Sequence, residues 1–161
     1  MEIADDFKIF LVDDDRMFLR LLEDHIRHFF TNVKIRSFLT GEECLKNIDQ
    51  HPDAIILDYF LPGINGFSTY LQIKQKLPEV PVVMLSNNGN VKTIQQMLSQ
   101  GIYDYIMKGK DYIEELQFNL REITKHTVGK EEVVGFDKDI LYILTIGIIM
   151  FLILFLVWVF V

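Results

Sequence analysis

The chain has 161 residues, with 16 Lys and Arg against 23 Asp and Glu, which gives a formal net charge of −7. This length is sufficient for one domain with a full hydrophobic core. The acidic balance and the lack of a basic stripe argue against a surface that binds nucleic acid. The single cysteine excludes an intrachain disulfide and a metal cage built from cysteines.

Five apolar segments within residues 1–125 have the length and composition of buried β-strands. They cover residues 7–12, 33–38, 54–57, 80–85 and 102–107. Segments with helical signals alternate with them, at residues 16–30, 40–48, 66–77, from the loop 87–90 to Gly101, and 111–125. This alternation predicts βαβ crossovers and a doubly wound parallel sheet, an α/β fold, although periodicity does not fix the order of the strands.

Several predicted helices have local signals at their ends. Asp15 precedes the first helix and is suited to cap it. Thr40 and Glu43 have the spacing of a capping box at the start of the second helix. Pro78 is expected to stop the third helix, because proline has no backbone N–H and clashes with the preceding turn.

Polar side chains stand at the carboxyl ends of four predicted strands. They are Asp13 and Asp14 after the first strand, Asp58 after the third, Ser86 after the fourth and Lys108 after the fifth. The carboxyl ends of parallel strands meet at one edge of a sheet, so we expect these side chains to converge. Three carboxylates at close range repel one another unless a cation lies between them, and Mg²⁺ prefers oxygen ligands of this kind.

The converging groups have the chemistry of a phosphoryl-acceptor site. The Asp58 carboxylate would act as the nucleophile, and the Lys108 ammonium would pair with it or with a phosphoryl group attached to it. The Ser86 hydroxyl would donate a hydrogen bond to a phosphoryl oxygen. Chance explains any one of these positions, but all of them in this order indicate a functional site.

Five segments carry a resemblance to a known family. They are FLVDDD at 10–15, TGEE at 40–43, IILDYFLPGING at 55–66, VVMLS at 82–86 and YDYIMK at 103–108. Residues 7–125, about three quarters of the chain, resemble the receiver domain of bacterial two-component response regulators. The resemblance implies a flavodoxin-like sheet of order 2-1-3-4-5, Mg²⁺ dependence, and phosphorylation by a histidine kinase or a phosphotransfer protein.

The resemblance also implies roles for individual residues. Asp58 would be the phosphoacceptor, converted to 4-aspartylphosphate. Asp13 and Asp14 would be the acidic pair that binds Mg²⁺, with Asp14 the more direct ligand. The backbone carbonyl of Phe60 and the carboxylate of Asp58 would complete the metal ligands from the protein.

Ser86 and Lys108 would contact the phosphoryl group, and Tyr105 matches the aromatic switch residue of the family. In that family the hydroxyl residue moves toward the phosphate, and the aromatic ring fills the space that it leaves. The alternative for Tyr105 is a half-buried strand aromatic, and both interpretations can hold together.

Three positions depart from the family pattern. Gly109 follows the lysine where the family usually has a cis-proline, so we expect a trans peptide bond there, since a cis bond to a residue other than proline costs about 3 kcal/mol. Asn87 is larger than the residue usual after Ser86, and Phe60 is apolar where many relatives are polar. We expect these two residues to alter the access of water to Asp58, giving a phosphorylated lifetime unlike that of fast chemotaxis-type receivers.

Residues 140–161 contain no charged residue, and 22 residues at about 1.5 Å each give about 33 Å of helix. This length would cross a hydrocarbon core of about 30 Å. Apolar residues occupy every face, and Tyr142 and Trp158 lie near the two ends, as interfacial aromatic residues do. The sequence therefore predicts a C-terminal transmembrane anchor joined by a linker, 126–139, with a buried core helix as the alternative.

These features predict a membrane-tethered, single-domain response regulator in the bacterial cytoplasmic membrane, with the receiver on the cytoplasmic side. Phosphorylation would switch a surface for an unidentified membrane-proximal output protein. The protein would not be an enzyme, since it would catalyse at most its own phosphorylation and dephosphorylation. Two alternatives stay open: a phosphate sink or relay intermediate, and a docking subunit of a membrane complex that works without phosphorylation.

Overall fold

The computed structural model describes residues 7–87, 90–126, 142 and 146. The chain divides into two units, Met1–Thr124 and Lys125–Val161. The sheet and the helices packed on it belong to the first unit. The linker and the transmembrane helix predicted over 126–161 lie outside the described residues, apart from residues 126, 142 and 146. In the described part, no helix has the length and apolar character needed to cross a membrane.

Five parallel strands form one sheet, in the order β2-β1-β3-β4-β5, which confirms the expected doubly wound fold. The strands are β1 (Lys8–Val12), β2 (Lys34–Phe38), β3 (Ala54–Asp58), β4 (Val82–Ser86) and β5 (Asp104–Met107). The predicted fourth strand began two residues earlier. Pro81 has no N–H to donate to a ladder, and only its carbonyl pairs, with the N–H of Ile55 at 3.0 Å.

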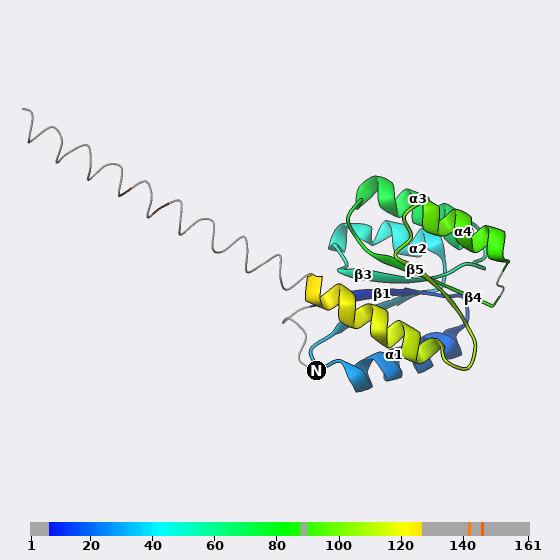
Figure 1. Ribbon diagram of the computed structural model, residues 1–161, viewed down its shortest axis with the longest axis horizontal. Helices are drawn as coiled ribbons and strands as arrows, with labels where there is room; N and C mark the ends of the chain where they lie inside the picture. Colours follow the sequence, from blue (N-terminus) through cyan, green and yellow to red (C-terminus); the bar gives the residue numbers. More distant parts are fainter. Residues whose placement is uncertain (1–6, 88–89, 127–141, 143–145, 147–161) are drawn as a thin grey trace, which may run out of the picture. The chain divides into compact units, whose positions relative to one another are not determined.

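Helices cover both faces of the sheet (Figure 1). They are α1 (Arg16–Phe29), α2 (Gly41–Lys46), the 3₁₀ turn η1 (Ile48–Gln50), α3 (Gly66–Lys76), α4 (Val91–Ser99) and a last helix over residues 112–126. In Figure 1, α1 and the yellow 112–126 helix lie on one face, and α2, α3 and α4 lie on the other. The sheet therefore lies between two helical layers.

Alternate residues of each central strand supply two separate cores. In β3, Ala54 and Ile56 pack under α1 and the 112–126 helix, whereas Ile55 and Leu57 pack under α2, α3 and α4. The alternation follows from the two-residue period of a strand, which sends successive side chains to opposite faces. It explains why the central strands read as continuous apolar runs in the sequence.

The predicted helix caps are present, with one difference in detail. Asp15 accepts hydrogen bonds from the N–H groups of Met17 and Phe18 at 2.8 and 3.1 Å. Thr40 Oγ1 accepts from Glu43 N at 3.2 Å, but the Glu43 carboxylate returns to the N–H of Leu39, at 3.1 Å, rather than to that of Thr40. The reciprocal capping therefore fixes the chain one residue before the cap.

Candidate functional site

Asp58 lies at the carboxyl end of β3 and is almost completely buried. Its Oδ1 atom is 2.6 Å from the Nζ atom of Lys108, which follows β5. The Lys108 backbone is held at the neighbouring strand, because its N–H donates to the carbonyl of Ser86 at 2.8 Å. Strand pairing thus fixes both the acceptor carboxylate and the backbone that carries the ammonium.

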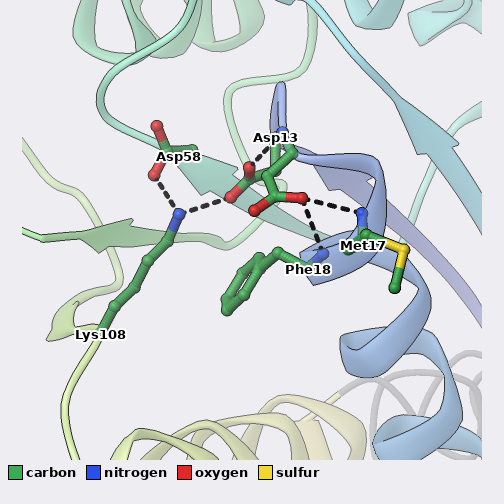
Figure 2. Close-up of polar contacts among 6 residues, drawn as sticks. Asp13, Met17, Phe18, Asp58 and Lys108 are labelled. Atoms are coloured by element: carbon green, nitrogen blue, oxygen red, sulfur yellow. Dashed lines mark hydrogen bonds and ion pairs between the residues drawn. The ribbon is translucent and has the colours of Figure 1, made fainter.

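Asp13 brings a second buried carboxylate to the same ammonium. Its Oδ2 atom lies 2.5 Å from Lys108 Nζ, so the ammonium lies between Asp13 and Asp58, as Figure 2 shows. The N–H of Asp13 continues the ladder to β2 by donating to Phe38 at 3.1 Å, and Asp13 Oδ1 accepts from Asp15 N at 2.9 Å. The start of α1 and the end of β1 are therefore joined at this carboxylate.

Burial and charge act in opposite directions on these groups. Burial raises the pKa of Asp58, and the Asp13 charge adds to this effect, although Lys108 partly offsets it. Burial also disfavours the Lys108 ammonium, but its hydrogen bonds and ion pairs with Asp13 and Asp58 outweigh that effect, so its pKa is raised. Lys108 consequently keeps its charge while two carboxylates compete for it.

Asp14 is exposed, unlike its neighbour Asp13. In the described part of the chain, no three His, Cys, Asp or Glu side chains are already grouped to hold a metal ion. The side chains at this edge nevertheless suit a hard divalent cation. Two buried carboxylates share a single ammonium, which leaves negative charge for a cation, and the candidate metal ligands are all oxygens. Asp14 and the carbonyl of Phe60 are the further oxygens that the sequence places at this edge.

Ser86 lies on β4, the strand beside Asp58, and Tyr105 lies on β5, the next strand along the sheet. Ser86 is fully buried at the end of β4, where residue 58 pairs with the residue before it, Leu85. Tyr105 is half-buried in β5 and packs against the core under α2, α3 and α4. Their roles as phosphoryl contact and switch remain predictions.

The three departures from the family pattern lie near this edge. The peptide bond from Lys108 to Gly109 is trans, as expected, and no cis bond occurs among the described residues. Asn87 is exposed directly after Ser86, and the Phe60 side chain is 51 % exposed. The effect of Asn87 and Phe60 on water access stays a prediction.

Two further residues contribute to the site in ways that the sequence pattern did not indicate. The ring of Phe18, in the first turn of α1, lies under Lys108 with its centroid 4.3 Å from Nζ. Glu42 Oε1 accepts from the N–H of Ile64 at 3.0 Å and so links α2 to the loop between β3 and α3. An aromatic residue in the first turn after the acidic pair was the available signal for the first contact, whereas the second joins residues far apart in sequence.

The Glu42 contact predicts a pH-dependent contribution to stability. Hydrogen bonds from the backbone N–H groups of Glu42 and Ile64 hold the pKa of Glu42 below its ordinary value of 4.5. A carboxyl group whose pKa is depressed by folding stabilises the protein above its unfolded pKa, and this contribution is lost as the pH falls through the folded value. We expect Glu42→Gln to lower the free energy of unfolding modestly at neutral pH, and the deficit to shrink below pH 4.5.

Urea unfolding of the full chain at neutral pH and again below pH 4.5 measures this effect. Glu114→Gln, which changes an exposed carboxylate on the 112–126 helix, is the matched control and should show no such pH-dependent difference. A Glu42→Gln deficit that is the same at both pH values would show that the charge of Glu42 does not contribute.

A comparison with known proteins places this geometry in a family. The family model for the response regulator receiver domain matches residues 9–118. The response regulator DctR of Bacillus subtilis is 34 % identical over 108 residues, which are 64 % of this chain and 46 % of DctR. The transcriptional regulatory protein ZraR of Escherichia coli is 28 % identical over 124 residues, 76 % of this chain and 27 % of ZraR.

Solved structures agree with the sequence matches. The BeF3-activated receiver domain of DrrB, from Thermotoga maritima, superposes with a TM-score of 0.66 at 25 % identity and covers 74 % of this chain and 97 % of that domain. The match thus includes nearly the whole of an isolated receiver, but less than half the length of the curated relatives DctR and ZraR. The family match, the sheet order and the residues at the strand ends agree, and the chain belongs to the response regulator receiver domain family.

Proposed function

We propose that this chain receives a phosphoryl group on Asp58 from a histidine kinase or a phosphotransfer protein, in a Mg²⁺-dependent reaction. Receiver domains are signalling proteins that are generally not classed as enzymes, and in general they bind Mg²⁺. The observation that carries the proposal is the Lys108 ammonium held between the buried carboxylates of Asp13 and Asp58.

In the proposed reaction, a carboxylate oxygen of Asp58 attacks the phosphorus atom of the donor. A new O–P bond forms as the P–N bond to the donor imidazole breaks, and the donor leaves as the neutral ring after taking up a proton. Lys108 would shift from the Asp58 oxygen to a phosphoryl oxygen, and Ser86 would donate its hydroxyl hydrogen to another. Bound Mg²⁺ would supply positive charge at the phosphoryl oxygens, with Asp13, Asp14, Asp58 and the carbonyl of Phe60 as its ligands.

The phosphoryl group adds a charge of about −1.5 to −2 where there was one carboxylate charge. We propose that Ser86 and Tyr105 respond to this charge and alter the surface around α4, β5 and the 112–126 helix. Curated relatives include the transcriptional regulatory protein ZraR, of which this chain covers 27 %. The net charge of −7 of the present chain favours a protein as its output partner, rather than nucleic acid.

Phosphorylation of the full chain by acetyl phosphate tests the proposal. In Mg²⁺ the wild type is expected to gain the mass of one phosphoryl group, and this gain should disappear with EDTA and in Asp58→Ala. Asp24→Ala, which removes an exposed carboxylate from α1, is the matched control and should react like the wild type. Equal phosphorylation of Asp58→Ala and the wild type would contradict the assignment.

We also propose that residues 140–161 anchor the chain in the cytoplasmic membrane with the receiver in the cytoplasm. The anchor is supported by the uncharged length of this segment. The orientation is supported by the proposed reaction, since the histidine kinase and Mg²⁺ would act in the cytoplasm. Anchoring would raise the effective concentration of the receiver near membrane partners.

Membrane fractionation tests the anchor. The full chain expressed in bacteria is expected to stay with the membranes after an alkaline wash, and a chain that lacks 140–161 is expected to be released. A full chain that washes off as readily as the shortened one would contradict the anchor without touching the assignment of Asp58.

A further inference from the structure

The ammonium of Lys108 contacts an aromatic ring as well as two carboxylates. Its Nζ atom is 4.3 Å from the centroid of the Phe18 ring, while the oxygens of Asp13 and Asp58 lie 2.5 and 2.6 Å away. Figure 2 shows the Phe18 ring close to the lysine head group, which lies between the Asp58 and Asp13 carboxylates. The lysine head group therefore contacts two carboxylates and an aromatic ring at once.

The ring is held by the same helix start that holds Asp13. The N–H of Phe18 donates to Asp15 Oδ1 at 3.1 Å, and Asp15 N donates to Asp13 Oδ1 at 2.9 Å. The centroid of the Phe18 ring also lies 5.8 Å from that of Tyr112, in the 112–126 helix. Both neighbours restrict where the ring can move.

Phe18 packs against the core but is not one of its buried residues. The buried core residues of α1 are Leu19, Leu22 and Ile26, whereas Phe18 is only half-buried and lies at the end of the helix nearest the site. A leucine in this position would supply similar apolar contact with the core. A leucine would not attract a cation, because only an aromatic face carries the negative quadrupole that does.

The contact constrains a side chain that is otherwise flexible. Lysine carries its charge on four rotatable methylene groups, and its ammonium has three N–H donors. Two donors are directed at the carboxylates of Asp13 and Asp58. The ring attracts the ammonium from a further side and covers it, in keeping with a Lys108 side chain that is only 11 % exposed.

We propose that Phe18 is a positioning residue that holds the Lys108 ammonium where the incoming phosphoryl oxygens arrive. The inference rests on the proposed phosphorylation of Asp58. It assigns to the first turn of α1 a second task besides placing the acidic pair: it keeps the charge of Lys108 at the acceptor before the donor binds. Misplacement of a reacting group by even a small distance costs rate, so such a constraint acts on the chemical step.

The test compares Phe18→Leu, Phe18→Tyr and the wild type as full chains in detergent. With acetyl phosphate and saturating Mg²⁺, Phe18→Leu is expected to lower the maximal rate of phosphorylation by roughly two- to thirtyfold, the range of a cation–π contact. Phe18→Tyr keeps the aromatic face and should restore the wild-type rate. Met17→Leu, at a neighbouring side chain that is 72 % exposed, controls for changes to the helix start, and thermal unfolding controls for the fold.

A spectroscopic readout tests the contact without the reaction. The aromatic ring current is expected to shift the NMR signals of the Lys108 side-chain methylene next to Nζ upfield in the wild type and in Phe18→Tyr, and this shift should vanish in Phe18→Leu. Equal maximal rates for Phe18→Leu and the wild type, or a Lys108 signal that Phe18→Leu leaves unchanged, would overturn the inference alone. A wild type that takes up no phosphoryl group would instead overturn the proposed function.

Discussion

Replacing Lys108 with methionine is expected to lower the rate of phosphorylation of Asp58 by about 10²- to 10³-fold, the usual effect of removing one preorganised electrostatic contact to a reacting group. The variant loses the ammonium that contacts Asp58 at 2.6 Å and Asp13 at 2.5 Å. Burial and the Asp13 charge would then raise the pKa of Asp58 further, because Lys108 would no longer offset them.

Lys110→Met is the matched control, because Lys110 is exposed two residues further along the chain. Both variants lose one positive charge close to the same strand end, so a general effect of net charge on the phosphodonor would appear in both. The rate constant with acetyl phosphate measures the difference. If Lys108→Met and Lys110→Met slowed the reaction equally, the contact between Lys108 and Asp58 would have no special part in it.

Replacing Gly66 with alanine is expected to destabilise the domain by about 1–3 kcal/mol and to disturb the acceptor. A Cβ atom at residue 66 would lie 2.0 Å from the carbonyl oxygen of Asp58 and 2.8 Å from the Cα atom of Tyr59. These are backbone atoms, which cannot rotate away, and the N–H of Gly66 already donates to Tyr59 at 2.9 Å. The start of α3 would therefore have to move away from the end of β3.

Gly109→Ala is the control for this substitution, because the nearest atom to its added Cβ, the carbonyl oxygen of Met107, is 3.8 Å away, an ordinary contact. Thermal and urea unfolding should show a clear loss of stability for Gly66→Ala and little change for Gly109→Ala. A Gly66→Ala variant as stable as the wild type would show that the loop and α3 relax more freely than their close contact indicates.

The secondary structure could be predicted well because its signals are local. The strands β3 and β4 are short apolar runs that stop at a polar residue, and the side chains of Asp15, Thr40 and Asn90 cap the helices that follow them. The order of the strands came from the family resemblance, because periodicity contains no information on which strands are neighbours. The convergence of Asp13, Asp58 and Lys108 followed from the parallel sheet.

The finer geometry of the site could not be predicted, because it depends on contacts between distant residues. Asp13 and Asp14 are identical neighbours in sequence, but Asp13 continues the β1–β2 ladder through its N–H and is buried, whereas Asp14 is exposed. The helical period of residues 16–30 does not show that the Phe18 ring faces Lys108. The link from Glu42 to Ile64 spans 22 positions and depends on where α2 lies in the fold.

The anchor predicted over 140–161 rests on hydropathy and length alone, since it falls outside the described residues apart from 142 and 146. It is independent of the phosphoryl-acceptor chemistry, which needs only the sheet edge. The proposed function thus has two separable parts, and the experiments on Asp58 and on the membrane fraction can fail independently.

Borohydride trapping of the phosphorylated full chain tests the central claim most directly, because borohydride reduces an aspartyl phosphate to homoserine at the residue that carried it. After reaction with acetyl phosphate and Mg²⁺, peptide mass spectrometry should find homoserine at position 58 and aspartate at positions 13 and 14. Homoserine at Asp13 or Asp14, or a phosphorylated chain with aspartate still at position 58, would contradict the account.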